Sequence, residues 1–198
     1  MTATSQLRRP GTAALTRRYA SWRRGGPGLG LLACFALLAA LPFATAPGHL
    51  IADTKFELAV NPAGFLSSAV TLWNPQQFGV LLNQAVGYLF PMGPFFELLR
   101  HIGTAGWIVQ RLWLSALLIT AFGGAVWLAA RMSIGTSRTR LAAGLAYALS
   151  PAALSMLGQT SGEFLPMALM PWIILPLTDS GPWLAGAAVS RRATARYR

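Results

Sequence analysis

The sequence predicts an all-α membrane protein, a polytopic helical bundle with about four transmembrane helices and a long interfacial outer segment. Of its 198 residues, 54% are hydrophobic and only 11% are charged. Soluble domains carry about 25% charged residues, so this composition favours a membrane protein. Long apolar runs separate three arginine-rich segments, which is the charge pattern of a chain that crosses a bilayer repeatedly.

The first predicted span covers about residues 28–46 and follows a basic, acid-free tail, residues 1–26. A basic tail before an apolar run is also typical of a secretory signal peptide, and Ala44-Thr45-Ala46 offers a cleavage pattern. The run is about 19 residues long, which is enough to cross a bilayer and longer than a usual signal core. A retained span is therefore the favoured interpretation.

Residues 47–106 form the predicted outer segment. Proline and asparagine pairs, Asn61-Pro62 and Asn74-Pro75, indicate turns within it. Residues 78–90 resemble an apolar helix, which the sequence around Pro91 and Pro94 breaks. Broken apolar segments of this kind are expected to lie at the membrane interface or to re-enter the bundle.

Three more spans are predicted, at about residues 107–130, 141–157 and 164–177. The third contains Ser150-Pro151, where a kink is expected because proline disrupts helical hydrogen bonding. A short loop, residues 131–140, connects the second and third spans, and a tight turn at 158–163 connects the third and fourth.

Thirteen of the fifteen arginines lie in the N-terminal tail, in the 131–140 loop and at the C-terminus. Lys and Arg are enriched in cytoplasmic loops, so these three segments are expected inside and the acidic segments outside. The predicted location is therefore the cell membrane, multi-pass, with a cytoplasmic N-terminus. The net charge of +11 is spread between apolar runs, which argues against nucleic acid as a partner and for the lipid bilayer.

Carboxylates beside the first span are the leading candidates for chemistry. Asp53 follows that span directly, and Glu57, four positions later, would share a face with it if this stretch is helical. A carboxylate at the outer face can act as a general base on a sugar hydroxyl. Glu163, in the second outer turn, is a second catalytic candidate, and its structural alternative is an acid that stabilises a helix N-terminus.

Two basic residues are candidates for binding a phosphate. Arg111 lies near the outer end of the second span, and Lys55 lies between Asp53 and Glu57. Arginine offers paired donors to phosphate, although a side chain reaching the lipid headgroups explains its position equally well. Tyr88, Trp113 and Glu57 are candidates for a substrate groove, and the aromatic residues equally fit an interfacial belt.

Other chemistry is not indicated. His49 and His101 have no metal-ligand spacing, and the single Cys34 lies inside an apolar run, so no metal site is predicted. The sequence has no glycine-rich phosphate-binding motif, so no nucleotide or other cofactor is expected. A transferase built on this chain is therefore expected to draw on a lipid-linked sugar donor.

Several motifs together resemble a known family. These motifs are Asp53-Thr-Lys-Phe-Glu57, Asn61-Pro-Ala-Gly-Phe65, Leu72-Trp-Asn-Pro75, Gly87-Tyr-Leu-Phe-Pro-Met-Gly-Pro94, Gln110-Arg-Leu-Trp113, Ala148-Leu-Ser-Pro151 and Pro166-Met-Ala-Leu-Met-Pro-Trp172, with Glu163 between the last two. They resemble the N-terminal GT-C region of the actinobacterial alpha-(1->3)-arabinofuranosyltransferases, over about residues 28–177.

The resemblance implies a glycosyltransferase of the outer membrane face. It implies a polyprenyl-phosphate arabinofuranose donor and a cell-wall arabinan acceptor, with Asp53 as the catalytic base. Within this reading the chain divides into a basic cytoplasmic tail (1–26), a GT-C-like membrane domain fragment (27–178) and a second basic tail (179–198). Family members continue beyond this length, so a truncated or frame-shifted product, inactive alone, is expected.

Two alternatives remain open from the sequence. Another polyprenyl-phosphate-sugar GT-C enzyme, such as a mannosyltransferase, would share the acid of the first outer loop. A non-catalytic membrane subunit would carry the same acids without needing them for sugar transfer.

Overall fold

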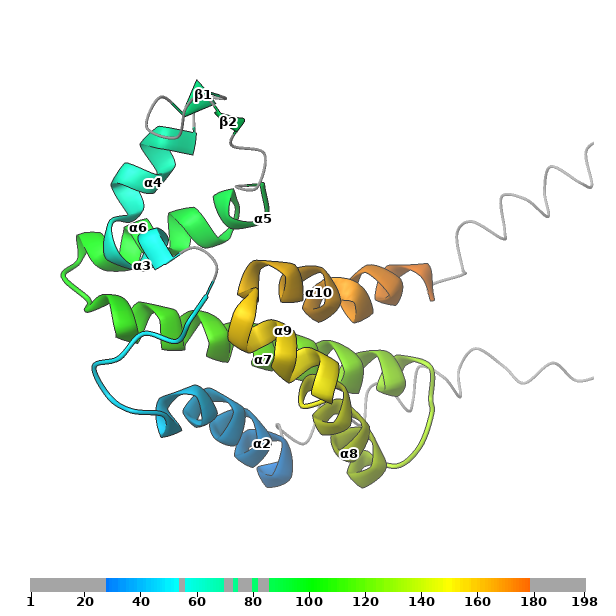
Figure 1. The fold of residues 1–198 in the computed structure, drawn as a ribbon. Coiled ribbons are helices and arrows are strands. Elements are labelled where there is room, and N and C mark those ends of the chain that lie inside the picture. The colour runs from blue at the N-terminus through cyan, green and yellow to red at the C-terminus, as the bar shows by residue number, and fades with distance from the viewer. Residues whose placement is uncertain (1–27, 54–55, 70–72, 75–79, 82–85, 179–198) are drawn as a thin grey trace, which may run out of the picture.

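A computed structural model describes residues 28–53, 56–69, 73–74, 80–81 and 86–178. The long helix α7 (Gly106–Arg131) lies at the centre of this structure and packs against α2, α6, α8 and α10. Figure 1 shows α7 running between α2 and α10, with α3 to α6 gathered above its N-terminal half. The described part of the chain is therefore a helical bundle organised around one helix.

The elements before α7 form the first helix, with its short 3-10 extension, and then a group of short elements over residues 56–101, which we call the outer layer. They are α2 (Leu29–Ala40), η1 (Leu41–Ala44), α3 (Phe56–Val60), α4 (Pro62–Ala69), β1 (Trp73–Asn74), β2 (Val80–Leu81), α5 (Val86–Leu89) and α6 (Met92–His101). The two strands pair antiparallel. The expected helix over residues 78–90 is therefore wrong in part: of the residues described in this range, Val80–Leu81 pairs as a strand and Val86–Leu89 is helical.

The elements after α7 are α8 (Ser137–Ala148), α9 (Pro151–Gln159) and α10 (Ser161–Leu177). Thr136 begins α8 with a capping box, in which its hydroxyl accepts from the Thr139 N–H. Ser150 caps α9 by accepting a hydrogen bond from the Ala153 N–H, and Pro151 occupies the first helical position, where a missing N–H costs nothing. The axis bends by 44° between α8 and α9, which confirms the kink predicted at Ser150-Pro151.

Close packing of side chains holds together α2, α7, α8 and α10. The rings of Phe35 and Phe122 meet edge to face with centroids 5.2 Å apart. Gly144 of α8 lies so close to α7 that a Cβ there would be 2.5 Å from the Val126 Cγ2. Gly124 serves the same purpose for α10, since a Cβ there would lie 2.6 Å from the Trp172 Nε1. Small residues at these positions let the helices approach closely.

Three prolines lie inside α10, and each removes a backbone N–H donor. For one of them, a side chain of α8 replaces the missing donor. Pro171 has no N–H, so the Met167 carbonyl one turn earlier loses its usual helical donor. The Tyr147 hydroxyl of α8 donates to that carbonyl at 2.6 Å. A second polar bond joins α10 to α7, from the Trp172 indole N–H to the Thr120 carbonyl at 2.9 Å.

Of the described residues, one helix alone is long and apolar enough to cross a membrane, namely α7. The bent pair α8 and α9 reaches that length and hydropathy only when taken together. The segments Leu29–Ala44 and Ser161–Leu177 are apolar but shorter. Helices thus occupy all four predicted spans, while the number that cross a bilayer stays a prediction. The predicted domain boundaries at 26 and 178 also stay predictions, since both flanking tails lie outside the described residues.

Candidate functional site

Asp53 lies where three distant segments of the chain meet. Its Oδ1 accepts a hydrogen bond from the Tyr88 hydroxyl at 3.3 Å, and its Oδ2 accepts one from the Ser161 hydroxyl at 2.5 Å. These partners are 35 and 108 residues away in the sequence. The carboxylate of Asp53 is therefore a junction between the outer layer and the start of α10.

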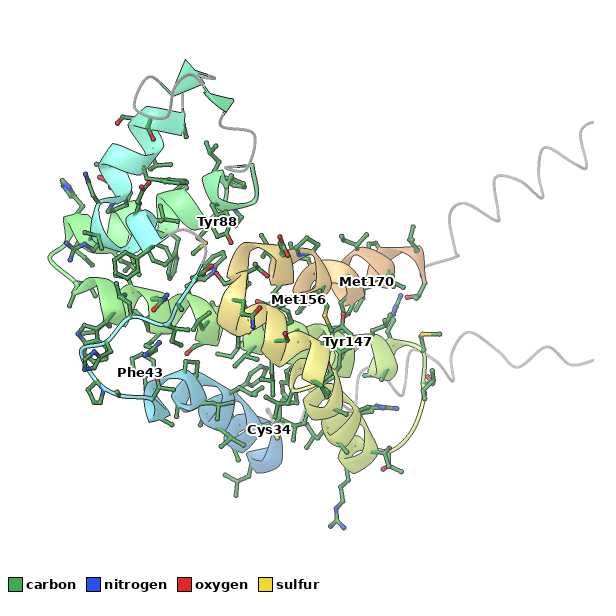
Figure 2. All side chains as sticks on the ribbon, viewed as in Figure 1. Cys34, Phe43, Tyr88, Tyr147, Met156 and Met170 are labelled. Carbon is green, nitrogen blue, oxygen red and sulfur yellow. The ribbon has the colours of Figure 1, made fainter. Side chains whose placement is uncertain are left out.

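The two hydroxyl groups differ in how they are positioned. Ser161 is the first residue of α10 and is completely buried, with the Met92 sulfur 3.9 Å from its Oγ. Tyr88 lies near the end of α5 and is 6% exposed. Figure 2 shows Tyr88 projecting toward the start of α10. Asp53 itself is half-buried, so its carboxylate is partly accessible while its partners are enclosed.

Side chains of α7 fix the backbone that leads to Asp53. The Gln110 carboxamide accepts from the Ile51 N–H at 2.8 Å and donates to the Ile51 carbonyl at 2.9 Å. Arg111 donates from Nη2 to the His49 carbonyl at 3.0 Å. We call these two side chains the α7 tether. Buried backbone N–H and carbonyl groups need hydrogen-bond partners. Because Ile51 lies outside any helix or strand, the Gln110 carboxamide supplies the partners for both of its main-chain groups.

Arg111 is buried within the protein rather than extended toward solvent. Only 2% of its surface is exposed, so the alternative of a side chain reaching the headgroups is wrong. Its Nε and Nη1 find no hydrogen-bond partner among the described residues. Leaving guanidinium donors buried without acceptors costs stability, so this arginine is an unexpected feature of an otherwise apolar helix.

Trp113, a predicted groove residue, is buried rather than open. It is 5% exposed and packs against Phe95 with ring centroids 5.5 Å apart. Its indole N–H has no partner among the described residues. Trp113 therefore joins α7 to α6, whereas Tyr88 lies directly against Asp53.

The remaining candidates are not drawn into this junction by the described contacts. Glu57 and Glu163 are both exposed, in the first turns of α3 and α10 respectively. Asp53 precedes α3, so the shared helical face expected for Asp53 and Glu57 does not form. Lys55 lies outside the described residues. Within the described ranges, no cluster of three His, Cys, Asp or Glu side chains could hold a metal ion.

Sequence reasoning assigned no role to Ser161, which contacts Asp53, or to Gln110, which contacts the backbone of Ile51. Ser161 belongs to the short polar run Gln159-Thr-Ser-Gly-Glu163 between two apolar helices, which is a weak signal for a site. Gln110 belongs to a motif that resembles the family, but as a single polar residue near the start of an apolar run it gave no sign of its partner. Neither residue type, nor its spacing to Asp53, distinguishes a partner of a carboxylate from an ordinary helix-end residue.

Comparisons with known proteins identify the family of this chain. Residues 37–197 match the family model described as "Alpha-(1->3)-arabinofuranosyltransferase, N-terminal GT-C domain". The match thus extends past residue 177, where the likeness of the motifs ends.

Two curated relatives, both called Alpha-(1->3)-arabinofuranosyltransferase, are similar to this chain. The protein from Mycobacterium tuberculosis is 45% identical over 142 residues, which is 71% of this chain and 10% of that protein. The one from Mycolicibacterium smegmatis is 47% identical over 138 residues, 69% of this chain and 10% of that protein. The chain thus corresponds to about a tenth of the length of either relative.

Solved structures show the same likeness in three dimensions. A cryo-EM structure of the arabinofuranosyltransferase AftD from Mycobacteria superposes with a TM-score of 0.69 at 43% identity, covering 74% of this chain and 11% of that one. A mutant of the same protein gives a TM-score of 0.70 over 74% of this chain and 12% of that one. The chain belongs to the alpha-(1->3)-arabinofuranosyltransferase family, in the part that corresponds to its N-terminal GT-C domain.

Proposed function

We propose that this chain is the part of a membrane glycosyltransferase that carries its catalytic base, Asp53. The enzyme transfers arabinofuranose from a polyprenyl-phosphate donor to a cell-wall arabinan acceptor on the extracytoplasmic face. The observation that carries the proposal is the half-buried Asp53 carboxylate held by two hydroxyl groups from distant segments. Both groups are neutral donors, so they orient the carboxylate without neutralising its charge.

The proposed step is a single displacement at the anomeric carbon. An acceptor hydroxyl oxygen forms a bond to that carbon, and the bond from the carbon to the phosphate oxygen breaks. The hydroxyl proton moves to the Asp53 carboxylate, and polyprenyl phosphate leaves with the bonding electron pair. A positioned base of this kind contributes roughly 10²- to 10⁴-fold to a rate.

Arg111 is proposed to bind the donor phosphate, with Lys55 as a second cation. Two buried guanidinium nitrogens without partners among the described residues support this role, because phosphate oxygens are the acceptors that match them. Glu163 is proposed to position the acceptor or to support the base, and Glu57 and Tyr88 to line the groove, whereas the buried Trp113 is no longer proposed to line it. Of these, Tyr88 has the direct contact with Asp53.

Membrane insertion is proposed with the N-terminus in the cytoplasm, which puts Asp53 outside. Large apolar side chains are exposed along α10, including Met170 and Ile173 at 56% and 64% (Figure 2). Exposed apolar surface of this extent on a helix is stable in lipid and unfavourable in water.

The test uses Asp53→Asn in a chimera, because the chain corresponds to about a tenth of its relatives. The chain replaces the matching segment of the Mycolicibacterium smegmatis relative, and membranes are supplied with polyprenyl-phosphoryl arabinofuranose and an arabinan acceptor. The amide keeps the shape but cannot accept the proton, so transfer is expected to fall by about 10²-fold or more. Expression and detergent elution of the two forms serve as the folding control.

Unchanged transfer by the Asp53→Asn chimera overturns the assignment of the base and supports a non-catalytic subunit. Donor competition addresses the sugar. In this assay, unlabelled donors compete with labelled polyprenyl-phosphoryl arabinofuranose. The unlabelled arabinofuranosyl donor is expected to inhibit transfer of the label more strongly than the matched mannosyl donor does. Equal inhibition by the two overturns the arabinose assignment in favour of another transferase.

A further inference from the structure

We propose that Ser161 is the positioning residue of Asp53, and that its hydroxyl fixes the orientation of the carboxylate that takes the proton. The proposal deepens the function proposed above and rests on it. It starts from the hydrogen bond between the Ser161 Oγ and the Asp53 Oδ2, which joins α10 to the segment after α2.

The Ser161 hydroxyl has one hydrogen to donate, and its surroundings commit that hydrogen to Asp53. Ser161 is completely buried, so water does not compete for it. The only other acceptor that the described contacts give is the Met92 thioether, at 3.9 Å, and a thioether is a weak acceptor. The Asp53 Oδ2 is therefore the strong acceptor for a donor that has no equivalent alternative.

The contact from Tyr88 to the other oxygen of Asp53 is longer. The Tyr88 hydroxyl lies 3.3 Å from Oδ1, which is outside the 2.5–3.0 Å that is typical of O–H···O bonds. Of the two hydroxyl groups, Ser161 is therefore the one whose geometry fixes the orientation of the carboxylate.

The anchor is itself held firmly in place. Ser161 begins α10, and α10 is fixed to α8 through Tyr147 and to α7 through Trp172. A shift of α10 would thus carry the Ser161 hydroxyl away from Asp53. Misplacing a reacting group by about 1 Å costs on the order of 100-fold in rate, so a fixed anchor matters for catalysis.

A direct readout of this hydrogen bond is available in the chain itself. The sequence has two aspartates, Asp53 and Asp179, so carboxyl-¹³C-aspartate labelling gives two resonances. Asp53→Asn removes one of them and so identifies the Asp53 signal. In detergent micelles at fixed pH, Ser161→Ala is expected to shift the Asp53 resonance and to leave Asp179 in place.

Kinetics in the chimera give the second readout. Ser161→Ala is expected to lower kcat by roughly 10- to 100-fold and to leave KM within about twofold, because orientation of the base acts on the chemical step. Ser161→Cys keeps a weaker donor on a slightly larger atom, so its kcat is expected to lie between those of the unchanged chimera and of Ser161→Ala. Ser115→Ala is the matched control, a buried serine of α7 that bonds the Ala39 and Arg111 carbonyls.

The outcomes separate this proposal from the proposed function. A shifted Asp53 resonance with a lower kcat for Ser161→Ala, and neither change for Ser115→Ala, supports the positioning role. An unshifted resonance, or an unchanged kcat in a chimera that Asp53→Asn inactivates, overturns the role of Ser161 alone. Transfer that survives Asp53→Asn overturns the proposed function and the positioning role with it.

Discussion

The two ends of α7 are held to their neighbours by different forces. At its N-terminal end, which we call the outer end, Gln110 and Arg111 make hydrogen bonds to the backbone of Ile51 and His49. In its C-terminal half, which we call the inner end, Gly124 and the neighbouring Gly144 of α8 allow side chains to meet at contact distance. One helix therefore serves as a polar anchor for irregular backbone and as a close-packed partner for other helices.

The difference follows from what each end must hold. Residues 45–53 after η1 have no helix or strand of their own, so their main-chain groups need partners from elsewhere. The helices α8 and α10 satisfy most of their own backbone, so close packing dominates where they meet α7, with the Trp172–Thr120 hydrogen bond added to it. Changes at the outer end should therefore affect chemistry, and changes at the inner end should affect stability.

The largest expected effect is on transfer, from Arg111→Met in the chimera. Two of its guanidinium nitrogens are buried without partners among the described residues, so removing them relieves a cost that offsets the lost bond to His49. We expect the melting temperature of the chain in detergent to stay within a few degrees. Transfer should fall by about 10²-fold, which is the usual effect of deleting one preorganised donor to a developing anion.

Arg100→Met is the control for this substitution. Arg100 lies at the end of α6 and donates to the Thr104 carbonyl at 3.0 Å, outside the junction around Asp53. It should leave transfer unchanged. A large drop in melting temperature for Arg111→Met with normal transfer per folded molecule would show a purely structural arginine.

The next largest effect concerns the inner end and falls on stability. In Gly144→Ala the new methyl group would meet Val126 at 2.5 Å and Phe122 at 2.9 Å. Overpacking of this kind costs about 1–3 kcal/mol, which should lower the thermal midpoint of the chain in detergent. Transfer per folded chimera should be unchanged, because this contact is remote from Asp53.

Gly158→Ala separates packing from backbone effects. Gly158 also lies in a helix, α9, but nothing is within 4 Å of the position of its Cβ. Alanine there should be neutral or stabilising by up to about 1 kcal/mol, since it favours helix more than glycine does. Equal midpoints for the two variants would contradict close packing as the force at the inner end.

Gln110→Met sharpens the comparison at the outer end. Methionine keeps the length of the side chain but leaves the Ile51 N–H and carbonyl without their partner. The expected loss is about 1–2 kcal/mol and is local to the segment before Asp53. Hydrogen exchange followed by mass spectrometry should show faster exchange in residues 48–53 and unchanged exchange in α7. Uniform acceleration over the whole chain would mean that Gln110 stabilises the bundle and not the segment.

The sequence predicted the parts of this molecule that rest on local or periodic signals. The four apolar helices follow from runs of hydrophobic residues, and the bend follows from Ser150-Pro151, whose effect is confined to neighbouring residues. Asp53 was identifiable because a carboxylate beside an apolar run is uncommon. Val80–Leu81 was mistaken for helix because its apolar composition fits both states, and pairing with β1 decides the outcome.

The partners of Asp53 could not be predicted in the same way. Ser161 is 108 residues away, and only the packing of α10 against the outer layer brings its hydroxyl to the carboxylate. Arg111 was recognised as an unusual charge in an apolar run, but its burial could not be predicted. That burial depends on long-range packing, including the contact with the backbone of His49, 62 residues away. A helix produces a repeating pattern of hydrophobic residues that can be recognised in a sequence. A single long-range contact between two polar residues produces no such pattern.

The smallest expected effect comes from a polar contact at the inner end, where packing dominates. Tyr147→Phe removes the hydroxyl that donates to the Met167 carbonyl, which Pro171 leaves without a helical donor. The loss should be about 1 kcal/mol, measured as the change in unfolding free energy in mixed micelles. Pro171→Ala restores an N–H one turn after Met167, so Tyr147→Phe should cost less in that background. A double-mutant cycle should therefore give a coupling of about 0.5–1 kcal/mol. Strictly additive effects would mean that the tyrosine stabilises α10 through its ring alone, and the inner end would then have no polar contact to α8 that matters.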